Sequence, residues 1–334
     1  MLIVRVGAMG DVLHALPGVA ALRAAEPECG IDWVVEPRWA PLLVNAEQKG
    51  PVVDRVLLAE TRLWRSAPLS GATLRSIAGL RRAIRAERYD AVVDMQGTLR
   101  SAVIGRLAKV ENFAGYADPR EAAAARMYRR PLKRRGTHVV EQGVALLGEA
   151  YGLTLEPAAV MLPEEGWAEA WAEELVGTQR VCVLAASAGW GAKQWPAEGF
   201  GQLARELREE GFTVMVNATR REDPVARQVA EASGGAAEVV VCSVAGLMAL
   251  LRRTAVLVGG DSGPTHLAAA LGVPLVGLYG PTDPARNGPW GPGPKRVLRD
   301  AASVTSYKRR AEVDPGLARM EVAEVLGAVR EVLG

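Results

Sequence analysis

Short runs of β-branched and other apolar residues alternate along the chain with longer runs whose apolar residues recur at helical spacing. Parallel strands need long crossover connections, which are usually helices, so this alternation indicates parallel sheets covered on both faces. The runs at residues 181–185 and 256–258 contain no charged residue, which is typical of strands buried on both sides. The chain is therefore predicted to adopt a doubly wound α/β fold.

The same pattern gives the elements that we expect. The predicted strands cover residues 2–6, 31–35, 52–58, 91–94, 181–185, 213–217, 238–242, 256–259 and 274–278. The predicted helices cover residues 13–25, 72–86, 197–210, 224–232, 244–252 and 264–271, with one last amphipathic helix at 315–332.

The elements fall into two blocks, because the alternation stops near Leu153 and resumes after a Pro- and Glu-rich stretch without clear periodicity. We expect a first domain at residues 1–154, a linker at 155–175, a second domain at 176–311 and a C-terminal helix at 312–334. Two such domains would face one another across a cleft at the carboxyl ends of their strands.

Composition excludes several classes of protein. A net charge of +2 over 334 residues argues against nucleic-acid binding driven by bulk charge. Three cysteines without metal-ligand spacing fit a reducing compartment, and three histidines far apart in sequence predict no metal site. We see no signal peptide and no apolar run long enough to span a membrane, so we expect a cytoplasmic protein.

The most informative short motif follows the strand predicted at 256–259. It crowds Asp261, Ser262, Gly263 and His266 into the turn before a helix that opens on Gly-Pro. A helix start offers free N–H groups and a partial positive charge, which suit a phosphate. The alternative is that Asp261 or Ser262 only caps the helix while His266 packs on its neighbour, and the local sequence leaves both interpretations open.

Asp11 follows the first strand, at the ligand-binding edge of a doubly wound sheet. A carboxylate there can take a proton from an acceptor hydroxyl, but it can also be the N-cap of the next helix. The preceding Gly7-Ala8-Met9-Gly10 does not match the dinucleotide fingerprint, which disfavours a dehydrogenase.

Further polar residues occupy other predicted loops. Lys193, in the glycine-containing loop that begins at Ser187, can neutralise a departing diphosphate or simply be solvated. Glu222 can accept hydrogen bonds from ribose hydroxyls or precede the helix at Pro224. A basic segment at 126–135, with Arg120 before it, could meet an anionic acceptor or a membrane surface, although such runs are more often solvated.

Six phrases together resemble the ADP-heptose:lipopolysaccharide heptosyltransferases, glycosyltransferase family 9, and most closely its heptosyltransferase I members. The phrases are MGDVLHALP (9–17), DWVVE (32–36), YDAVVDMQG (89–97), KQWP (193–196), DSGPTHL (261–267) and YGPTDP (279–284). They occur in this order over residues 9–284, and the ordered set is far more specific than any one phrase.

The resemblance implies a GT-B fold, with two Rossmann-like domains facing an interdomain cleft and a final helix that returns to the first domain. It implies a metal-independent, inverting glycosyltransferase that moves heptose from its substrate ADP-heptose to a Kdo residue of Kdo-lipid A. No cofactor is implied. By the family's pattern, Asp11 is the general base and Lys193 stabilises the phosphates of the leaving ADP.

The resemblance also assigns binding residues and partners. The donor-binding residues are Ser187, Glu222, Asp261, Ser262, Gly263 and His266, and the acceptor-binding residues are Met9, Gly10 and Arg120. The implied partners are a nucleotide-sugar donor and an anionic lipid-linked sugar acceptor at the cytoplasmic face of the inner membrane, with no nucleic acid. Heptosyltransferase II, a transferase with another acceptor such as a protein, and a nucleotide-sugar-binding protein without catalysis stay open as alternatives.

Overall fold

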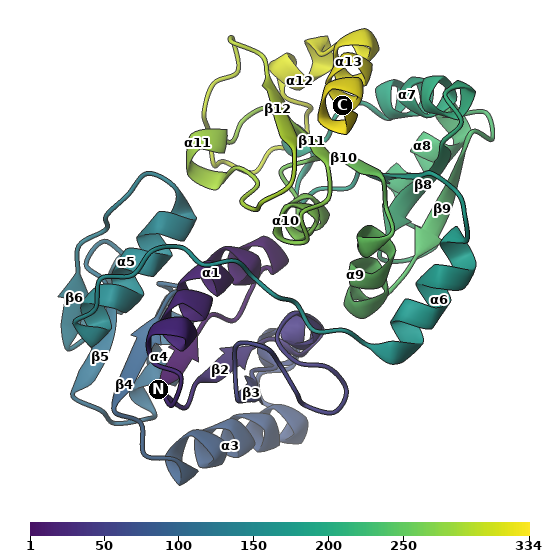
Figure 1. The fold of residues 1–334 in the computed structure, drawn as a ribbon. Coiled ribbons are helices and arrows are strands. Elements are labelled where there is room, and N and C mark those ends of the chain that lie inside the picture. Colours follow the sequence, from purple (N-terminus) through teal and green to yellow (C-terminus); the bar gives the residue numbers. More distant parts are fainter. The chain divides into compact units, whose positions relative to one another are not determined.

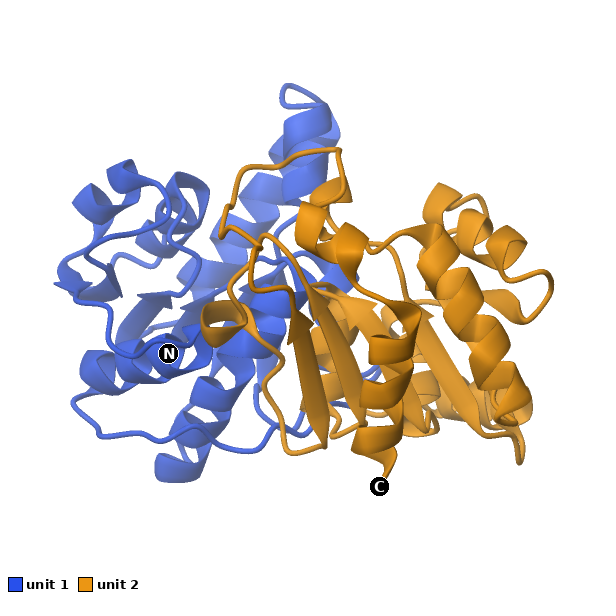
Figure 2. Ribbon diagram, turned by 90° about the horizontal axis from the view of Figure 1, so that it is seen from above, with its two compact units in different colours: residues 1–163 blue, residues 164–334 orange.

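The structure, a computed structural model, describes residues 1–334 and divides into two compact units, Met1–Pro163 and Glu164–Gly334 (Figure 2). Each unit is a six-stranded sheet flanked by helices (Figure 1), and all its strands are parallel. This confirms the α/β class predicted from the sequence. No helix in these residues is both long and apolar enough to cross a bilayer.

The sheet of the first unit has the strand order β3-β2-β1-β4-β5-β6. Its strands are β1 (Leu2–Val4), β2 (Asp32–Val35), β3 (Arg55–Leu58), β4 (Ala91–Asp94), β5 (Asn112–Tyr116) and β6 (Arg130–Leu132). Its α-helices are α1 (Met9–Ala25), α2 (Thr61–Ser66), α3 (Gly71–Ala86), α4 (Leu99–Arg106) and α5 (Val139–Tyr151), with 3-10 turns η1 (Pro37–Leu42) and η2 (Ala122–Met127).

Helices α1 and α5 pack closely against one another on this sheet. Gly18 in α1 allows the approach, because a Cβ atom there would lie 2.9 Å from Leu147 Cδ1 and 3.3 Å from the backbone of Val144. The inner strands β1 and β4 are buried along their whole length, as strands covered on both faces are expected to be.

The sheet of the second unit has the strand order β12-β11-β10-β7-β8-β9. Its strands are β7 (Val181–Ala185), β8 (Thr213–Ala218), β9 (Ala237–Val241), β10 (Val256–Gly260), β11 (Leu275–Tyr279) and β12 (Lys295–Arg299). Its helices are α6 (Gly166–Val176), α7 (Ala197–Glu209), α8 (Pro224–Ala232), α9 (Val244–Arg252), α10 (Gly263–Ala270), α11 (Pro284–Asn287), α12 (Pro315–Arg319) and α13 (Val322–Leu333), with the 3-10 turn η3 (Gly191–Lys193).

Counted from the start of its own unit, each sheet has the strand order 3-2-1-4-5-6. This is the doubly wound order of dinucleotide-binding folds, in which a crevice opens between the first and fourth strands at their carboxyl ends. The loops at these points follow β1 and β4 in the first unit, and β7 and β10 in the second. They carry Asp11 in one unit and Lys193 and Asp261 in the other.

All nine predicted strands are present, with bounds that differ by at most a few residues. The sequence does not predict β5, β6 or β12, because none of them is a continuous apolar run. Gly115 interrupts β5, Pro131 lies in β6, and charged residues fill much of β12. The last two are edge strands, where proline and charge are tolerated.

The stretch that we expected to be a linker, 155–175, contains most of helix α6. This helix packs on α9 through Ala168, Ala172 and Val176, which recur every four residues and are buried. The boundary between the two units therefore falls between Pro163 and Glu164, before the helix.

The expectation that the final helix returns to the first domain is wrong. The predicted single helix is two, α12 and α13, and α13 packs on α7, β11 and β12 of the second unit. Val325, Val329 and Val332 are buried there, and Trp195 Nε1 donates a hydrogen bond to the carbonyl of Met320 at 3.2 Å. The apolar stripe of α13 is buried against the sheet of its own unit, so no crossover is needed to cover it.

The α13 interface gives a test of stability. Val329→Ala removes two buried methyl groups and is expected to lower the free energy of unfolding by about 1–3 kcal/mol. Val304→Ala, the same change at a side chain that is 75% exposed, should cost less than about 0.5 kcal/mol. Urea denaturation measures both, and hydrogen exchange should show the lost protection in peptides from the second unit. Loss confined to residues 1–163 would contradict this packing.

Candidate active site

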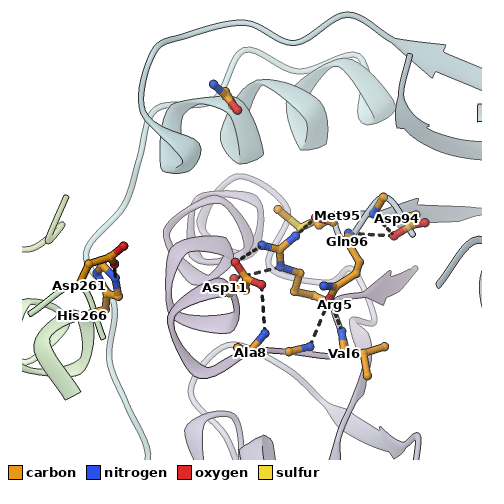
Figure 3. Close-up of polar contacts among 12 residues, drawn as sticks. Arg5, Val6, Ala8, Asp11, Asp94, Met95, Gln96, Asp261 and His266 are labelled. Atoms are coloured by element: carbon orange, nitrogen blue, oxygen red, sulfur yellow. Dashed lines mark hydrogen bonds and ion pairs between the residues drawn. The ribbon is translucent and has the colours of Figure 1, made fainter. Parts of the chain in front are cut away.

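Asp11 lies in the first turn of α1, directly after β1 (Figure 3). Its Oδ1 is 2.9 Å from Nη2 of Arg5, and its Oδ2 accepts a hydrogen bond from the N–H of Ala8 at 3.0 Å. Ala8, not Asp11, is the N-cap residue, although the carboxylate does satisfy an N–H group at the helix start. The Asp11 side chain is 35% exposed, so it is fixed by its partners and still open to solvent.

Arg5 is a site residue that sequence analysis misses. Its Nε donates to the carbonyl of Asp11 at 3.2 Å, and its Nη1 donates to the carbonyl of Met95 (Figure 3). The guanidinium therefore joins the loop after β1 to the loop after β4, and it is only 16% exposed. The available signal was a lone arginine inside the apolar run Leu2–Val6.

The loop after β4 is fixed by two further polar side chains. Gln96 accepts hydrogen bonds from the N–H groups of Val6 and Gly7 at 3.1 and 3.2 Å through its Oε1 atom. Asp94 is fully buried and accepts from the N–H of Gln96, among other donors. Burial raises the pKa of the Asp94 carboxyl, against the hydrogen bonds that favour its charged form.

The structure places the predicted acceptor-binding residues at the same edge of the first sheet. Met9 and Gly10 open α1, and Arg120 is exposed in the loop after β5. Gly97, with φ of +70°, lies close to that loop, since a Cβ on Gly97 would be 3.1 Å from the backbone nitrogen of Arg120. The loops after β1, β4 and β5 therefore line one edge, with Asp11 and Arg5 among them.

In the second unit, Asp261 joins two of the predicted residues. Its Oδ2 forms an ion pair with Nζ of Lys193. Its Oδ1 is 3.0 Å from Nε2 of His266 (Figure 3). The Asp261 and Lys193 side chains are 8% and 12% exposed. The three residues form a largely buried cluster at the point where β7 and β10 end, as their positions in the sequence suggested.

The charge state of Asp261 follows from its neighbours. Burial alone would raise the pKa of its carboxyl, but the hydrogen bond from His266 and the charges of His266 and Lys193 outweigh that effect. The pKa of Asp261 therefore lies well below its usual range. The group is ionised at neutral pH and acts there as a hydrogen-bond acceptor.

The start of α10 is adjacent to this cluster. Ser262 is its N-cap residue but makes no side-chain capping bond, and its hydroxyl instead lies 3.2 Å from Thr265 Oγ1. Ser262 therefore occupies the N-cap position without making the side-chain bond of a capping residue. Gly263 is the first helical residue, and the N–H groups of this turn add positive potential beside Lys193.

Gly260 permits the close approach of the two loops in the second unit. A Cβ atom on Gly260 would lie 2.6 Å from the carbonyl oxygen of Lys193, closer than real Cβ contacts allow. Lys193 Nζ also lies over the indole ring of Trp190, 4.2 Å from its centre. Arg309 also faces this ring, at 5.7 Å, from a basic loop near the C-terminus that the sequence analysis did not single out.

The structure places Ser187 and Glu222 in neighbouring loops. Ser187 Oγ donates a hydrogen bond to Oδ1 of Asp223 at 2.9 Å, and Asp223 is the N-cap of α8. Glu222 is exposed, and because Asp223 already caps the helix, its carboxylate is available at the carboxyl end of β8. No set of three or more His, Cys, Asp or Glu side chains in residues 1–334 is arranged to hold a metal ion.

The lowered pKa of Asp261 predicts a pH dependence. The ionised group stabilises the folded chain above its ordinary pKa of about 3.9, and this contribution is lost as the pH falls below that value. The difference in free energy of unfolding between the native chain and Asp261→Asn should shrink between about pH 4.5 and 2.5. Urea denaturation at several pH values measures it, and a difference that grows on acidification in this window would contradict the assignment.

Comparison with known proteins identifies the family. The family model described as glycosyltransferase family 9 (heptosyltransferase) matches residues 77–314. Lipopolysaccharide heptosyltransferase 1 of Pseudomonas aeruginosa is 30% identical, over 94% of this chain and 88% of its own length. The structure of the E. coli heptosyltransferase WaaC with ADP is 27% identical and has a TM-score of 0.80, with 99% of this chain and 98% of that chain covered.

A second structure of WaaC, with ADP-2-deoxy-2-fluoro heptose, has a TM-score of 0.76 at the same identity and coverage. The two doubly wound sheets are those of the GT-B glycosyltransferases. The sequence motifs, the fold and the family match agree, and the chain belongs to glycosyltransferase family 9, the heptosyltransferase family.

Proposed function

We propose that the chain transfers L-glycero-D-manno-heptose from ADP-heptose to a Kdo residue of Kdo-lipid A, with inversion, in the synthesis of the lipopolysaccharide inner core. The observation that carries the proposal is the Lys193–Asp261–His266 cluster beside the uncapped start of α10, in a chain of family 9. Among the similar proteins, WaaC is described with ADP and with an ADP-heptose analogue.

The donor binds on the second unit in this proposal. Lys193 has three N–H donors, so it can keep its ion pair with Asp261 and still donate to a phosphate oxygen. The N–H groups at Ser262 and Gly263 meet the same diphosphate, and His266 lies beside it. Fixed positive groups of this kind typically stabilise a developing negative charge by a few kcal/mol each.

The remaining donor contacts involve hydroxyl groups. The ionised carboxylate of Asp261 accepts hydrogen bonds from heptose hydroxyls, and the exposed carboxylate of Glu222 accepts them from the adenosine ribose. Ser187, in the loop after β7, adds a hydroxyl near the phosphates. The donor is a substrate, and the proposed reaction uses no cofactor or metal.

Asp11 acts as the general base. It takes the proton of an acceptor hydroxyl as that oxygen forms a bond to the anomeric carbon of the donor. The bond from this carbon to the ADP oxygen breaks, and its electron pair leaves with the diphosphate. Attack opposite the leaving group inverts the anomeric centre. Arg5 and the N–H of Ala8 hold the two carboxylate oxygens and orient the group.

The acceptor is anionic and lipid-linked, and it meets the first unit in this proposal. Met9 and Gly10 lie beside Asp11 at the start of α1, and Arg120 provides an exposed cation at the same edge. We place the reaction at the cytoplasmic face of the inner membrane, where a lipid-linked acceptor is presented. Labelled heptose offered with different acceptors separates this assignment from heptosyltransferase II and from a protein acceptor.

Replacement of the proposed base tests the mechanism. Asp11→Asn is expected to lower the rate of heptose transfer by more than about 100-fold while the affinity for ADP stays unchanged, because a general base contributes about 10²–10⁴ in rate. Turnover with labelled donor and calorimetric titration with ADP measure the two quantities. Asp90→Asn removes an exposed acid of the same unit and is the matched control. A variant with native turnover would exclude Asp11 as the base.

Replacement of the proposed phosphate ligand tests the donor site. Lys193→Gln is expected to weaken ADP binding by about 10-fold or more, because hydrogen bonds to charged groups contribute about 1.5–3 kcal/mol. Lys193→Arg keeps the charge and should lose less affinity. Lys133→Gln, at an exposed lysine of the first unit, should leave ADP binding unchanged. Native ADP affinity in Lys193→Gln would contradict a phosphate contact.

A further inference from the structure

Helix α3 buries only one of its faces. Thr73, Leu80 and Ile84 point into the first unit, and α3 lies at the margin of that unit in Figure 1. On its outer face, Leu74 and Ile77 are 59% and 40% exposed. The fold of the first unit therefore leaves large aliphatic side chains of this helix in contact with solvent.

The outer face of α3 is also strongly basic. The helix contains the arginines Arg75, Arg81, Arg82 and Arg85, all exposed, and no acidic residue. Arg81 and Arg85 follow Leu74 at spacings of seven and eleven residues, so they continue the same stripe along the helix. A shallow hollow runs along this stripe, lined by the two aliphatic side chains and three of the arginines.

The basic segment at 126–135 is less available for binding than its composition suggests. Arg130 donates hydrogen bonds to Asn112 Oδ1 and to the carbonyl of Ala150. Arg134 pairs with Asp118. Arg135 pairs with Glu149. Half of its six cations are therefore occupied inside the first unit. The four arginines of α3 are exposed on a helix without acids, and Arg85 Nε makes only a long hydrogen bond, to the carbonyl of Leu107 at 3.5 Å.

We propose that the outer face of α3 docks on the surface of an anionic phospholipid bilayer. Leu74 and Ile77 enter the interface between headgroups and acyl chains, and Arg81, Arg82 and Arg85 contact lipid phosphates. Helices that lie in a membrane interface combine these two kinds of side chain, since neither alone gives firm binding. The inference rests on the proposed function, because a lipid-linked acceptor is presented at such a surface.

Charge complementarity selects this partner over a second copy of the chain. Two α3 faces in contact would bring their arginines together with no carboxylate on either helix to pair with them, which is unfavourable. An anionic lipid surface supplies many phosphates at once. Each arginine near such a surface strengthens binding by about fivefold, and salt weakens it.

The direct test is cosedimentation of the full chain with vesicles. The native chain should bind vesicles of phosphatidylglycerol and phosphatidylethanolamine, and should bind phosphatidylcholine vesicles much more weakly. The triple variant Arg81→Gln, Arg82→Gln, Arg85→Gln should lose about 100-fold in affinity for the anionic vesicles. The double variant Leu74→Gln, Ile77→Gln should also bind less, and its residual binding should be more sensitive to salt.

The matched control removes the same charge elsewhere on the first unit. Arg126→Gln, Arg129→Gln, Lys133→Gln changes three exposed cations of the basic segment and should cost no more than about fivefold. An equal loss in this control would mean that bulk charge drives binding and would overturn the proposal. Native vesicle binding by the α3 variants would overturn it as well. So would a native dimer that dissociates in the Leu74→Gln, Ile77→Gln variant.

Enzyme assays separate this inference from the proposed function. With a water-soluble, deacylated Kdo acceptor, the arginine variant should transfer heptose at the native rate, because no α3 residue lies in the proposed active site. With acceptor embedded in anionic vesicles, the same variant should be slower. Native rates on both acceptors would overturn the docking role alone, whereas absence of transfer by the native chain to either acceptor would refute the proposed function and leave the vesicle result standing.

Discussion

The candidate site of the second unit depends on the pairing of β7 with β10, which places Lys193 next to Asp261. The chain between these strands passes through two further strands of the same sheet before it returns. Removal of two charges from water costs several kcal/mol per ion, and their attraction rarely exceeds that cost by much. Desolvation therefore offsets much of the attraction between the two groups, although the neighbouring charges still keep Asp261 ionised.

Each unit thus carries one carboxylate held by a cation, from the same loop in the first unit and from a neighbouring loop in the second, but the two environments differ. Asp11 is 35% exposed beside Arg5, whereas Asp261 is 8% exposed between Lys193 and His266. An accessible carboxylate can exchange a proton with a substrate, while a buried one with a depressed pKa stays ionised and binds hydroxyls. The proposed division between base and sugar ligand follows from this contrast.

The sequence predicts the parts of this structure whose cause is local. The inner strands are continuous apolar runs, and Asp11, Lys193 and Asp261 lie in the segments that follow them, so the pairing of β7 with β10 brings the last two to the same edge of the sheet. Other features depend on contacts between distant segments. The burial of α13 on its own unit requires contacts with β11 and β12, and the position of Arg5 requires the carbonyl of Met95, ninety residues away.

The backbone contact at Gly260 sets a limit on redesign of the proposed donor site. Any larger residue there would push β10 away from the carbonyl of Lys193. The Lys193 ammonium and the Asp261 carboxylate would then move apart. Efforts to broaden the range of accepted sugars can vary the exposed loops around this position. They have to leave Gly260 unchanged, because the absence of a side chain there lets Lys193 and Asp261 stay close enough to pair.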